Sequence, residues 1–403
     1  MLEQSTLFRK HFDTDDPDKI NEILEEEFRK VQTGPVQEWV KMTLPFYAPD
    51  PSLPSIPTPE EIEESRSGEY TRSDKAWFLG IGGSHVYRVK GVYAVKFSAS
   101  NSLMQEAENL LFLQDYKVRT PKIYAAFSHQ GADPLGLTIG ASGMEPKDRS
   151  QLPTFHYLVM EYLDGITLDE KMWKNIEPKA RVKIYEKLAE QLRLLRSIPP
   201  PGQSYYGRVH YQGYDPVCNM VRYRMNSLVG PFDTYEAFLQ QVYNTLEINL
   251  IRRLIFRPEI YPDMHLFTSI FHDCFDKTSK GGEPKLSHMD LKLDNMMLVP
   301  SASNSSSDRI EDYDFYLIDW EMMCWLPAWA EIAGGSVRLP QDGHHNLVMW
   351  EMSKGIKPFP YAEANFYREC AHALGGSLCN QQNGAPQLGV PSNSGTLTVF
   401  VRL

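Results

Sequence analysis

The sequence predicts an α+β chain of two lobes, with strands concentrated in the first lobe and helices in the second. β-prone runs at 77–97, 121–127 and 156–163 dominate the first half, and beyond them apolar residues recur at helical spacing. With 403 residues and 42% apolar residues, the chain can form more than one globular domain. We therefore predict a β-rich N-lobe at 70–163 and a helical C-lobe at 164–378.

An acidic extension is predicted before the N-lobe, over residues 1–69. Residues 1–44 have apolar side chains at helical spacing, and six prolines between 45 and 59 predict an extended connector. Residues 1–70 hold 16 acidic and 7 basic side chains, and the whole chain has a net charge of −11. Because nucleic acid requires a basic surface, this balance argues against it as a partner.

The N-lobe elements follow from local patterns. A turn at Lys90-Gly91 separates two strands, a helix is expected over 102–114, and 156–163 predicts a buried strand. The Gly-rich polar stretch at 128–150 predicts an exposed connection.

In the C-lobe, Pro178 suits a first helical turn, and an apolar stripe continues until Pro199. A second helix is predicted over 235–253. The stretch 379–403, rich in Asn, Gln, Gly, Pro and Ser, predicts an irregular tail.

Three features that the sequence lacks predict the cellular compartment of the protein. There is no run of about 18 apolar residues for a membrane span, and the start lacks the apolar core of a signal peptide. The five cysteines form no CxxC pair, which argues against a zinc site or a disulfide framework. We expect a cytoplasmic protein with reduced thiols and no membrane partner. Nothing in the sequence indicates an oligomeric state.

A glycine-rich turn is the first chemical signal. Gly80, Gly82 and Gly83, followed by Ser84, lie between two strand-like runs, where glycine lets backbone N–H groups approach a phosphate. No helix and no GK[ST] follow, so neither a Rossmann fingerprint nor a Walker loop fits. An ordinary hairpin turn remains the alternative.

A lysine and an acid form the second signal. Lys96 lies in an apolar strand, where burial is costly unless the ammonium meets an anion. Glu106 shares one helix face with leucines, while Glu108 lies about 200° around the helix. We therefore expect Glu106 to pair with Lys96; a solvent-facing Lys96 is the alternative.

The strongest signal is HMDLKLDN at 288–295, followed by LIDW at 317–320. In H-x-D-x-x-x-x-N, the aspartate (Asp290) can accept a hydroxyl proton while the asparagine (Asn295) binds Mg²⁺. Asp319, after an apolar strand, supplies a second hard oxygen ligand.

With these motifs in this order, the chain resembles the phosphotransferase family that contains aminoglycoside phosphotransferases and choline kinases, and in particular fungal members of unknown substrate. The resemblance spans roughly 70–375 and rests on FLGIGGSHVYRV, HMDLKLDN, LIDWE, the stretch 53–66 and Gly230-Pro231-Phe232. It implies a bilobal protein-kinase-like fold and transfer of the ATP γ-phosphate, with Mg²⁺, to a hydroxyl of a small molecule.

The resemblance also implies roles residue by residue. Asp290 is the catalytic base, His288 supports its loop, and Lys292 neutralises charge on the transferring phosphate. Magnesium is held by Asn295 and Asp319. The implied nucleotide-binding residues are Gly80, Gly82, Gly83, Ser84, Lys96, Glu106 and a hinge formed by Met160, Glu161, Tyr162 and Leu163.

Two departures from the family pattern bear on substrate. Met289 stands where the family usually has Gly, and Lys292 replaces the usual His, as in protein kinases. Against a protein kinase, Trp-Glu follows Asp319, no Ala-Pro-Glu segment follows, and 124 residues separate the hinge from His288. An atypical protein kinase and a catalytically silent nucleotide-binding scaffold remain alternatives, and the acceptor is not indicated.

Overall fold

The computed structural model of the chain describes residues 4–33, 38–65, 85–134, 149–215, 218, 220–222, 228–256, 270–275, 281–301, 309–338, 352–357 and 359–373. They fall into two compact units. The sheet unit comprises the described residues of 42–107 and 121–163, and the helical unit those of 1–41, 108–120 and 164–378.

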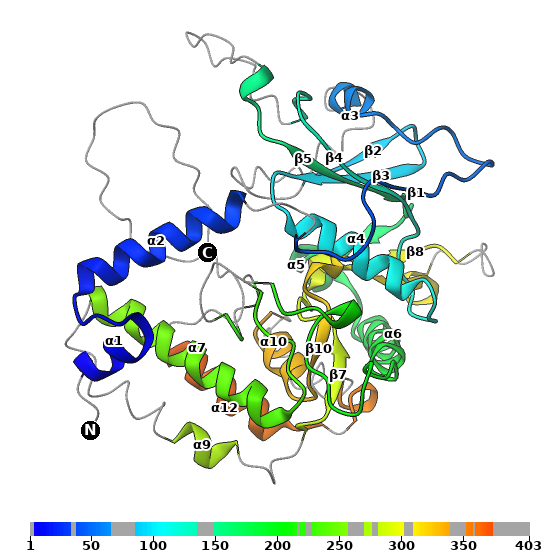
Figure 1. Cartoon of the computed structure of the whole chain (residues 1–403). Helices are drawn as coiled ribbons and strands as arrows, with labels where there is room; N and C mark the ends of the chain where they lie inside the picture. Colours follow the sequence, from blue (N-terminus) through cyan, green and yellow to red (C-terminus); the bar gives the residue numbers. More distant parts are fainter. Residues whose placement is uncertain are drawn as a thin grey trace. The chain divides into compact units, whose positions relative to one another are not determined.

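A five-stranded antiparallel sheet forms the sheet unit, with strand order β1-β4-β5-β3-β2 (Figure 1). Its strands are β1 (Phe46–Tyr47), β2 (His85–Val89), β3 (Tyr93–Ser98), β4 (Ile123–His129) and β5 (Phe155–Glu161). Two helices accompany it, α3 (Pro59–Ser65) and α4 (Ser102–Leu113), and the division between the units falls within α4. The predicted helix at 102–114 is thereby confirmed.

The predicted hairpin is confirmed over its described part. Val89 pairs with Tyr93 across the turn, where Lys90 and Gly91 have φ angles of 52° and 75°. Glycine adopts this left-handed region without the steric cost that a Cβ atom brings. The predicted strand residues before 85 lie outside the described part of the chain.

Aromatic side chains dominate the core on one face of the sheet. Phe127 and Tyr157 stack with ring centroids 5.1 Å apart, and Phe97 lies 6.0 Å from Tyr157. Ile62 of α3 joins this cluster. Such rings bury a large apolar area and fix the sheet against the segment that contains α3.

The proline-rich connector is more structured than predicted. We expected residues 45–59 to be only extended, but Phe46 and Tyr47 form β1 and pair with Ala126 and Ala125 of β4. Proline has no backbone N–H to donate to a neighbouring strand. The prolines of this segment flank the edge strand β1, so they do not interrupt its pairing with β4.

The helical unit contains most of the helices. They are α1 (Gln4–Phe12), α2 (Pro17–Thr33), α5 (Glu170–Asn175), α6 (Pro178–Arg196), α7 (Tyr235–Phe256), α9 (Phe271–Cys274), α10 (Ala330–Arg338) and α12 (Tyr361–Ala373). The helices predicted from Pro178 and over 235–253 are confirmed as α6 and α7. Pro178 occupies the first turn of α6, where its missing N–H costs nothing.

The helical pattern predicted within 1–44 forms two helices. Asp13, with a φ of 56°, ends α1, and Pro17 begins α2. Both helices pack on α7 (Figure 1). The apolar stripe of α2 therefore contributes to the helical unit.

Two small antiparallel sheets complete the helical unit. One pairs β7 (Pro284–Ser287) with β10 (Cys324–Pro327), and the other has the order β6-β8-β9, with β6 (Ile166–Thr167), β8 (Met296–Val299) and β9 (Asp314–Leu317). A β-rich first unit and a helix-rich second unit confirm the predicted α+β class.

Several predictions concern features outside this description or untested by it. The tail at 379–403 and part of the connection at 128–150 lie outside the described residues. The domain boundaries at 69, 163 and 378 remain predictions. Among the described residues, Cys218, Cys274, Cys324 and Cys370 form no disulfide. Among the described helices, none combines the length and apolar character that crossing a bilayer demands.

Candidate active site

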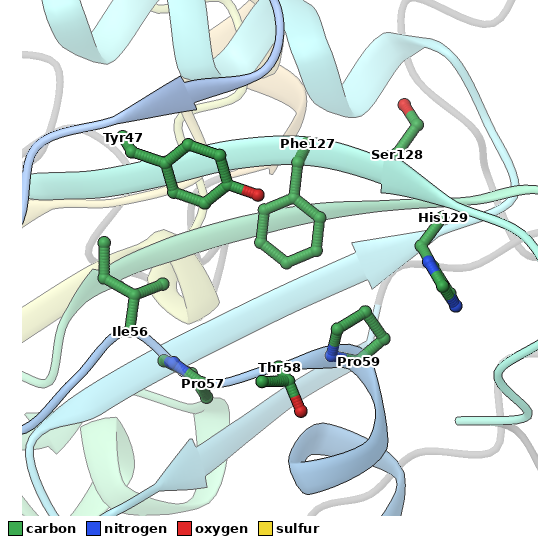
Figure 2. Close-up of a pocket in the computed structure, with 8 residues that line it drawn as sticks. All are labelled: Tyr47, Ile56, Pro57, Thr58, Pro59, Phe127, Ser128 and His129. Carbon is green, nitrogen blue, oxygen red and sulfur yellow. The ribbon is translucent and has the colours of Figure 1, made fainter.

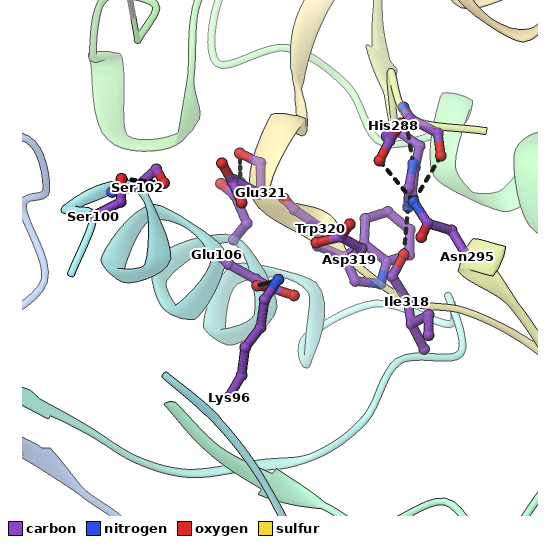
Figure 3. A network of polar contacts seen from close by, with 12 residues as sticks. Lys96, Ser100, Ser102, Glu106, His288, Asn295, Ile318, Asp319, Trp320 and Glu321 are labelled. Atoms are coloured by element: carbon purple, nitrogen blue, oxygen red, sulfur yellow. Dashed lines mark hydrogen bonds and ion pairs between the residues drawn. The ribbon is translucent and has the colours of Figure 1, made fainter. Parts of the chain in front are cut away.

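Lys96 and Glu106 form a buried ion pair in the sheet unit (Figure 3). The Lys96 Nζ atom lies 2.5 Å from Glu106 Oε2, and the two residues are 7% and 2% exposed. Since side chains alternate along β3, Lys96 lies on the face opposite the core residues Val95 and Phe97. The expected pairing is therefore present, and the solvent-facing alternative for Lys96 is wrong.

Glu108 points elsewhere, as the helical spacing predicts. Its two carboxylate oxygens accept hydrogen bonds within the helical unit, one from the Lys41 backbone at 2.7 Å and one from Gln212 Nε2 at 2.6 Å. Two buried acids within one turn of α4 thus have different partners.

One predicted hinge residue, Met160, lies on the same sheet face as Lys96. In the register of β3 and β5, Lys96 opposes Leu158 and Ala94 opposes Met160. Met160 and Lys96 therefore share a face of the sheet. The Tyr162 N–H donates to Val92 O at 3.0 Å, and Leu163 is the last residue of the sheet unit. Gly80, Gly82, Gly83 and Ser84 lie outside the described residues.

The loop after β7 is anchored by an acid that the sequence analysis missed. Glu331, in the first turn of α10, is fully buried and accepts the backbone N–H groups of His288 at 2.6 Å and Met289 at 3.0 Å. Hydrogen bonds to an ionised acceptor are the strong kind. One signal could have revealed it, because Glu331 is the single charged residue in the apolar run 323–333.

His288 fixes the loop from the other side (Figure 3). Its Nε2 atom lies 3.0 Å from Ile318 O, and its Nδ1 atom accepts the Asp290 N–H at 3.2 Å. Burial lowers the pKa of His288 against the opposing charges of Glu331 and Asp319. A neutral ring with its proton on Nε2 satisfies both bonds, so His288 acts as a positioning residue.

Lys292 and Asn295 both donate to the same carboxylate oxygen of Asp290. Asp290 Oδ2 accepts from Lys292 Nζ at 2.8 Å and from Asn295 Nδ2 at 2.8 Å. Asn295 Nδ2 also reaches Asp290 O at 2.9 Å. These donors favour the ionised carboxylate and hold it in one orientation, which is what a base requires.

Asn295 and Asp319 have the donor atoms that magnesium prefers. Because the Asn295 amide nitrogen is committed to Asp290, its Oδ1 atom is the one available for a cation. The backbone joins the two segments, since Ile318 N–H donates to Asn295 O at 3.0 Å. An amide oxygen and a carboxylate oxygen are hard ligands and therefore fit Mg²⁺.

Two left-handed residues shape this region. Met289 has a φ of 66° and Asp319 a φ of 67°. Glycine adopts this conformation most easily, which explains why a glycine suits the position of Met289. Asn109 Nδ2 steadies the segment after Asp319 by donating to Trp320 O at 2.8 Å.

A separate pocket of about 240 Å³ opens in the sheet unit (Figure 2). None of the predicted site residues lines it. Its walls are Tyr47, Phe127, Ser128, His129 and the segment 56–59. The pocket lies between β4 and the proline-rich segment and is distinct from the Lys96 face.

Comparison with known protein families decides the identity. The model of the phosphotransferase enzyme family matches residues 78–347. The chain belongs to this family. The match includes Lys96, Glu106 and the whole of 288–319, so the predicted resemblance to this phosphotransferase family is confirmed. The narrower resemblance to fungal members stays a prediction.

Solved structures of low sequence identity are similar to the chain. The ADP-bound aminoglycoside phosphotransferase APH(2'')-Ib is 14% identical, covering 77% of this chain and 87% of its own, with a TM-score of 0.45. The macrolide 2'-phosphotransferase MphH from Brachybacterium faecium is 13% identical, covering 74% and 82%, with a TM-score of 0.40. No curated protein matches the chain.

Proposed function

We propose that this phosphotransferase moves the γ-phosphate of ATP to a hydroxyl of a small molecule, with Asp290 as base. The observation that carries the proposal is the fixed Asp290 carboxylate, whose Oδ2 atom accepts from both Lys292 and Asn295 at 2.8 Å. Its loop is held by Glu331 and His288, so the base is positioned before substrate binds.

The reaction needs a proton acceptor, charge neutralisation and a clamp on the nucleotide. Asp290 takes the hydroxyl proton as the acceptor oxygen bonds to the γ-phosphorus and the bond to the β–γ bridging oxygen breaks, releasing ADP. Lys292 neutralises charge on the transferring phosphate. Mg²⁺ on Asn295 and Asp319 would supply positive charge for the phosphate oxygens.

Nucleotide binding is assigned to the sheet unit. Lys96, oriented by Glu106, would hold the α- and β-phosphates, and the turn containing Gly80, Gly82, Gly83 and Ser84 would cover them. The hinge Met160–Leu163 would meet the adenine. Support comes from the buried Lys96–Glu106 pair and from Met160 on the same sheet face.

A small acceptor is favoured over a protein side chain. The 124 residues between the hinge and His288 contain the long helices α6 and α7, which suit an enclosed small-molecule site. Trp320 and Glu321 follow the proposed metal ligand, where a protein kinase has Phe-Gly.

The test is phosphate transfer from γ-labelled ATP, with and without Mg²⁺, to amino alcohols, aminoglycosides and a generic protein substrate. We expect magnesium-dependent labelling of one small-molecule class. Labelling of protein alone would overturn the proposed acceptor class while retaining the mechanism. ATP binding with no transfer to a wide metabolite panel would favour the silent scaffold.

A further inference from the structure

Arg88 of β2 is a charged residue on the sheet face that also carries Lys96. Side chains alternate along a strand, and the next residue, Val89, belongs to the core cluster on the opposite face. In the strand register, Arg88 opposes Ala94, which in turn opposes Met160. Paired residues of neighbouring strands share a face, so Arg88 lies in one row with the predicted hinge residue Met160.

The Arg88 guanidinium lies over the ring of Tyr162, the third residue of the hinge. Its carbon atom is 4.2 Å from the ring centroid. Arg88 Nε donates to Gly91 O at 2.9 Å, which fixes the orientation of the planar group. Both residues are half-buried. Because a cation gains more from an aromatic face when water is partly excluded, this contact is stronger than one on open surface.

The backbone of the hinge is held at two successive residues. The Glu161 N–H donates to Lys122 O at 2.8 Å, next to β4, and the Tyr162 N–H donates to Val92 O at 3.0 Å, next to β3. With the Tyr162 ring under Arg88, contacts from three segments of the sheet unit hold the hinge in place.

A hinge that is already held favours binding of a nucleotide base. A flexible segment loses conformational freedom when a ligand orders it, and this loss subtracts from the affinity. The hinge is the segment assigned to adenine, whereas Lys96 is assigned to the phosphates. Arg88 should therefore affect the base equally in every adenine nucleotide. A direct attraction between Arg88 and phosphate would instead grow with the number of phosphates.

We propose that Arg88 is a positioning residue for the nucleotide base. It holds Tyr162 and, through that residue, the hinge backbone in the conformation that binds adenine. This inference rests on the proposed function, because it concerns the same nucleotide site. It adds to the residues assigned there one that acts through another.

The experiment measures calorimetric binding of adenosine, ADP and Mg·ATP to the full chain, well below the melting temperature of each variant. In Arg88→Leu we expect all three to bind about three- to tenfold more weakly, by the same factor. Tyr162→Leu should give a similar loss, and the double variant should be no weaker than either single variant. The matched control is Lys122→Leu, which removes a cation 5.1 Å from the Tyr124 ring but retains the Lys122 backbone carbonyl. It should bind like the wild type.

Lys96→Ala separates the two parts of the nucleotide, since it should weaken ADP and ATP far more than adenosine. If Arg88→Leu gives that same pattern, or binds all three ligands like the wild type, the proposal is overturned and the proposed function stands. A wild type that binds no ATP would overturn both.

Should Arg88→Leu fail to fold, Arg88→Lys decides, because lysine keeps the charge but lacks the planar group that stacks on a ring. A uniform weakening of about threefold for the three ligands supports the proposal. Wild-type affinity in Arg88→Lys overturns it.

Discussion

Each unit of the molecule contains one lysine–carboxylate pair of the proposed machinery, and the two pairs differ in burial. In the sheet unit, Lys96 and Glu106 lie 2.5 Å apart with side chains 8% and 3% exposed. In the helical unit, Lys292 and Asp290 lie 2.8 Å apart with side chains 34% and 10% exposed, and Lys292 is also 3.9 Å from Asp319 Oδ2. The first pair is almost wholly buried, whereas the lysine of the second pair is partly exposed and lies near a second carboxylate.

This difference matches what each pair would have to do. A buried pair is costly to separate, because each charge left behind loses an opposite charge at close range in a medium of low dielectric. A half-exposed lysine can leave its carboxylate at small cost. Under the proposed function, Lys96 would thus be an anchored clamp, while Lys292 would be able to follow a phosphate group as it moves from ATP to the acceptor.

The largest expected effect is that of Asp290→Asn on the chemical step. Asparagine retains the shape but cannot accept a proton, so transfer should fall about 10²–10⁴-fold while nucleotide binding is retained. The measurement is kcat on the acceptor found by the screen, together with ATP-dependent stabilisation. Full activity in Asp290→Asn would contradict the role of base.

The second prediction concerns stability and is tested by breaking the Lys96–Glu106 pair of the sheet unit. Lys96→Ala leaves Glu106 buried without its 2.5 Å partner, so we expect a loss of about 3–5 kcal/mol in the free energy of unfolding, in addition to weakened ATP binding. Lys96→Met combined with Glu106→Gln removes both charges and should recover most of this stability, but not the binding of ATP.

The matched control for that pair is Lys122→Met. Lys122 pairs with Asp50 at 3.0 Å on the surface of the same unit, with a side chain 52% exposed. Its loss should change the melting temperature far less than Lys96→Ala does. Equal losses in the two variants would show that burial does not distinguish the pairs.

Local patterns predicted the elements that carry these pairs. The strand with Lys96, the helix with Glu106 and the loop at 288–295 all follow from periodicity or motif spacing, because the side chains involved are close in sequence. The Glu106 assignment followed from the helical period alone, which separates it from Glu108.

Long-range contacts were not predictable in this way. Glu331 lies about 40 residues after the loop that it anchors, and Asn109 bonds to Trp320 across more than 200 residues. The strand β1 depends on pairing with β4, not on its own two residues. Such partners are chosen by tertiary packing, for which the sequence has no local signal beyond an isolated acid in an apolar run.

A third prediction compares the buried histidines of the two units. Burial lowers the pKa of His156 from 6.5 to about 4, and burial also lowers that of His288. The unfolded chain binds protons that the folded one does not, so stability is complete above pH 6.5 and falls as the pH drops toward 4. His156 should contribute about 3 kcal/mol to this loss.

The check is urea unfolding at about pH 7 and about pH 4.5. His156→Gln should remove most of the acid-induced loss, and the remainder should include the contribution of His288. His129→Gln is the matched control, because His129 lies at the end of the same strand that carries the Ser128 partner of His156 but is only partly buried. An unchanged pH dependence in His156→Gln would contradict the prediction.

The fourth prediction concerns the anchor of the helical-unit loop. Glu331→Gln keeps one acceptor oxygen but loses the charge that holds the N–H groups of His288 and Met289. We expect a loss of about 2 kcal/mol in stability, since hydrogen bonds to a charged group contribute about 1.5–3 kcal/mol. Because Glu331 acts through the loop, kcat should fall while the KM for ATP stays unchanged. A change in KM alone would contradict this role.

The smallest effect tests whether the helical-unit loop carries backbone strain. Met289 has a φ of 66°, a region that a Cβ atom disfavours by about 1–2 kcal/mol. Met289→Ala and Met289→Gly both remove the side chain, but only glycine relieves the backbone, so Met289→Gly should be the more stable by about 1 kcal/mol. At Glu186, an exposed position within α6, the order should reverse, because alanine is favoured over glycine in a helix by about 1 kcal/mol. Chemical unfolding of the four variants measures both differences. Alanine as stable as glycine at position 289 would mean that the loop conformation costs nothing, and that the positioning of Asp290 depends on side-chain anchors alone.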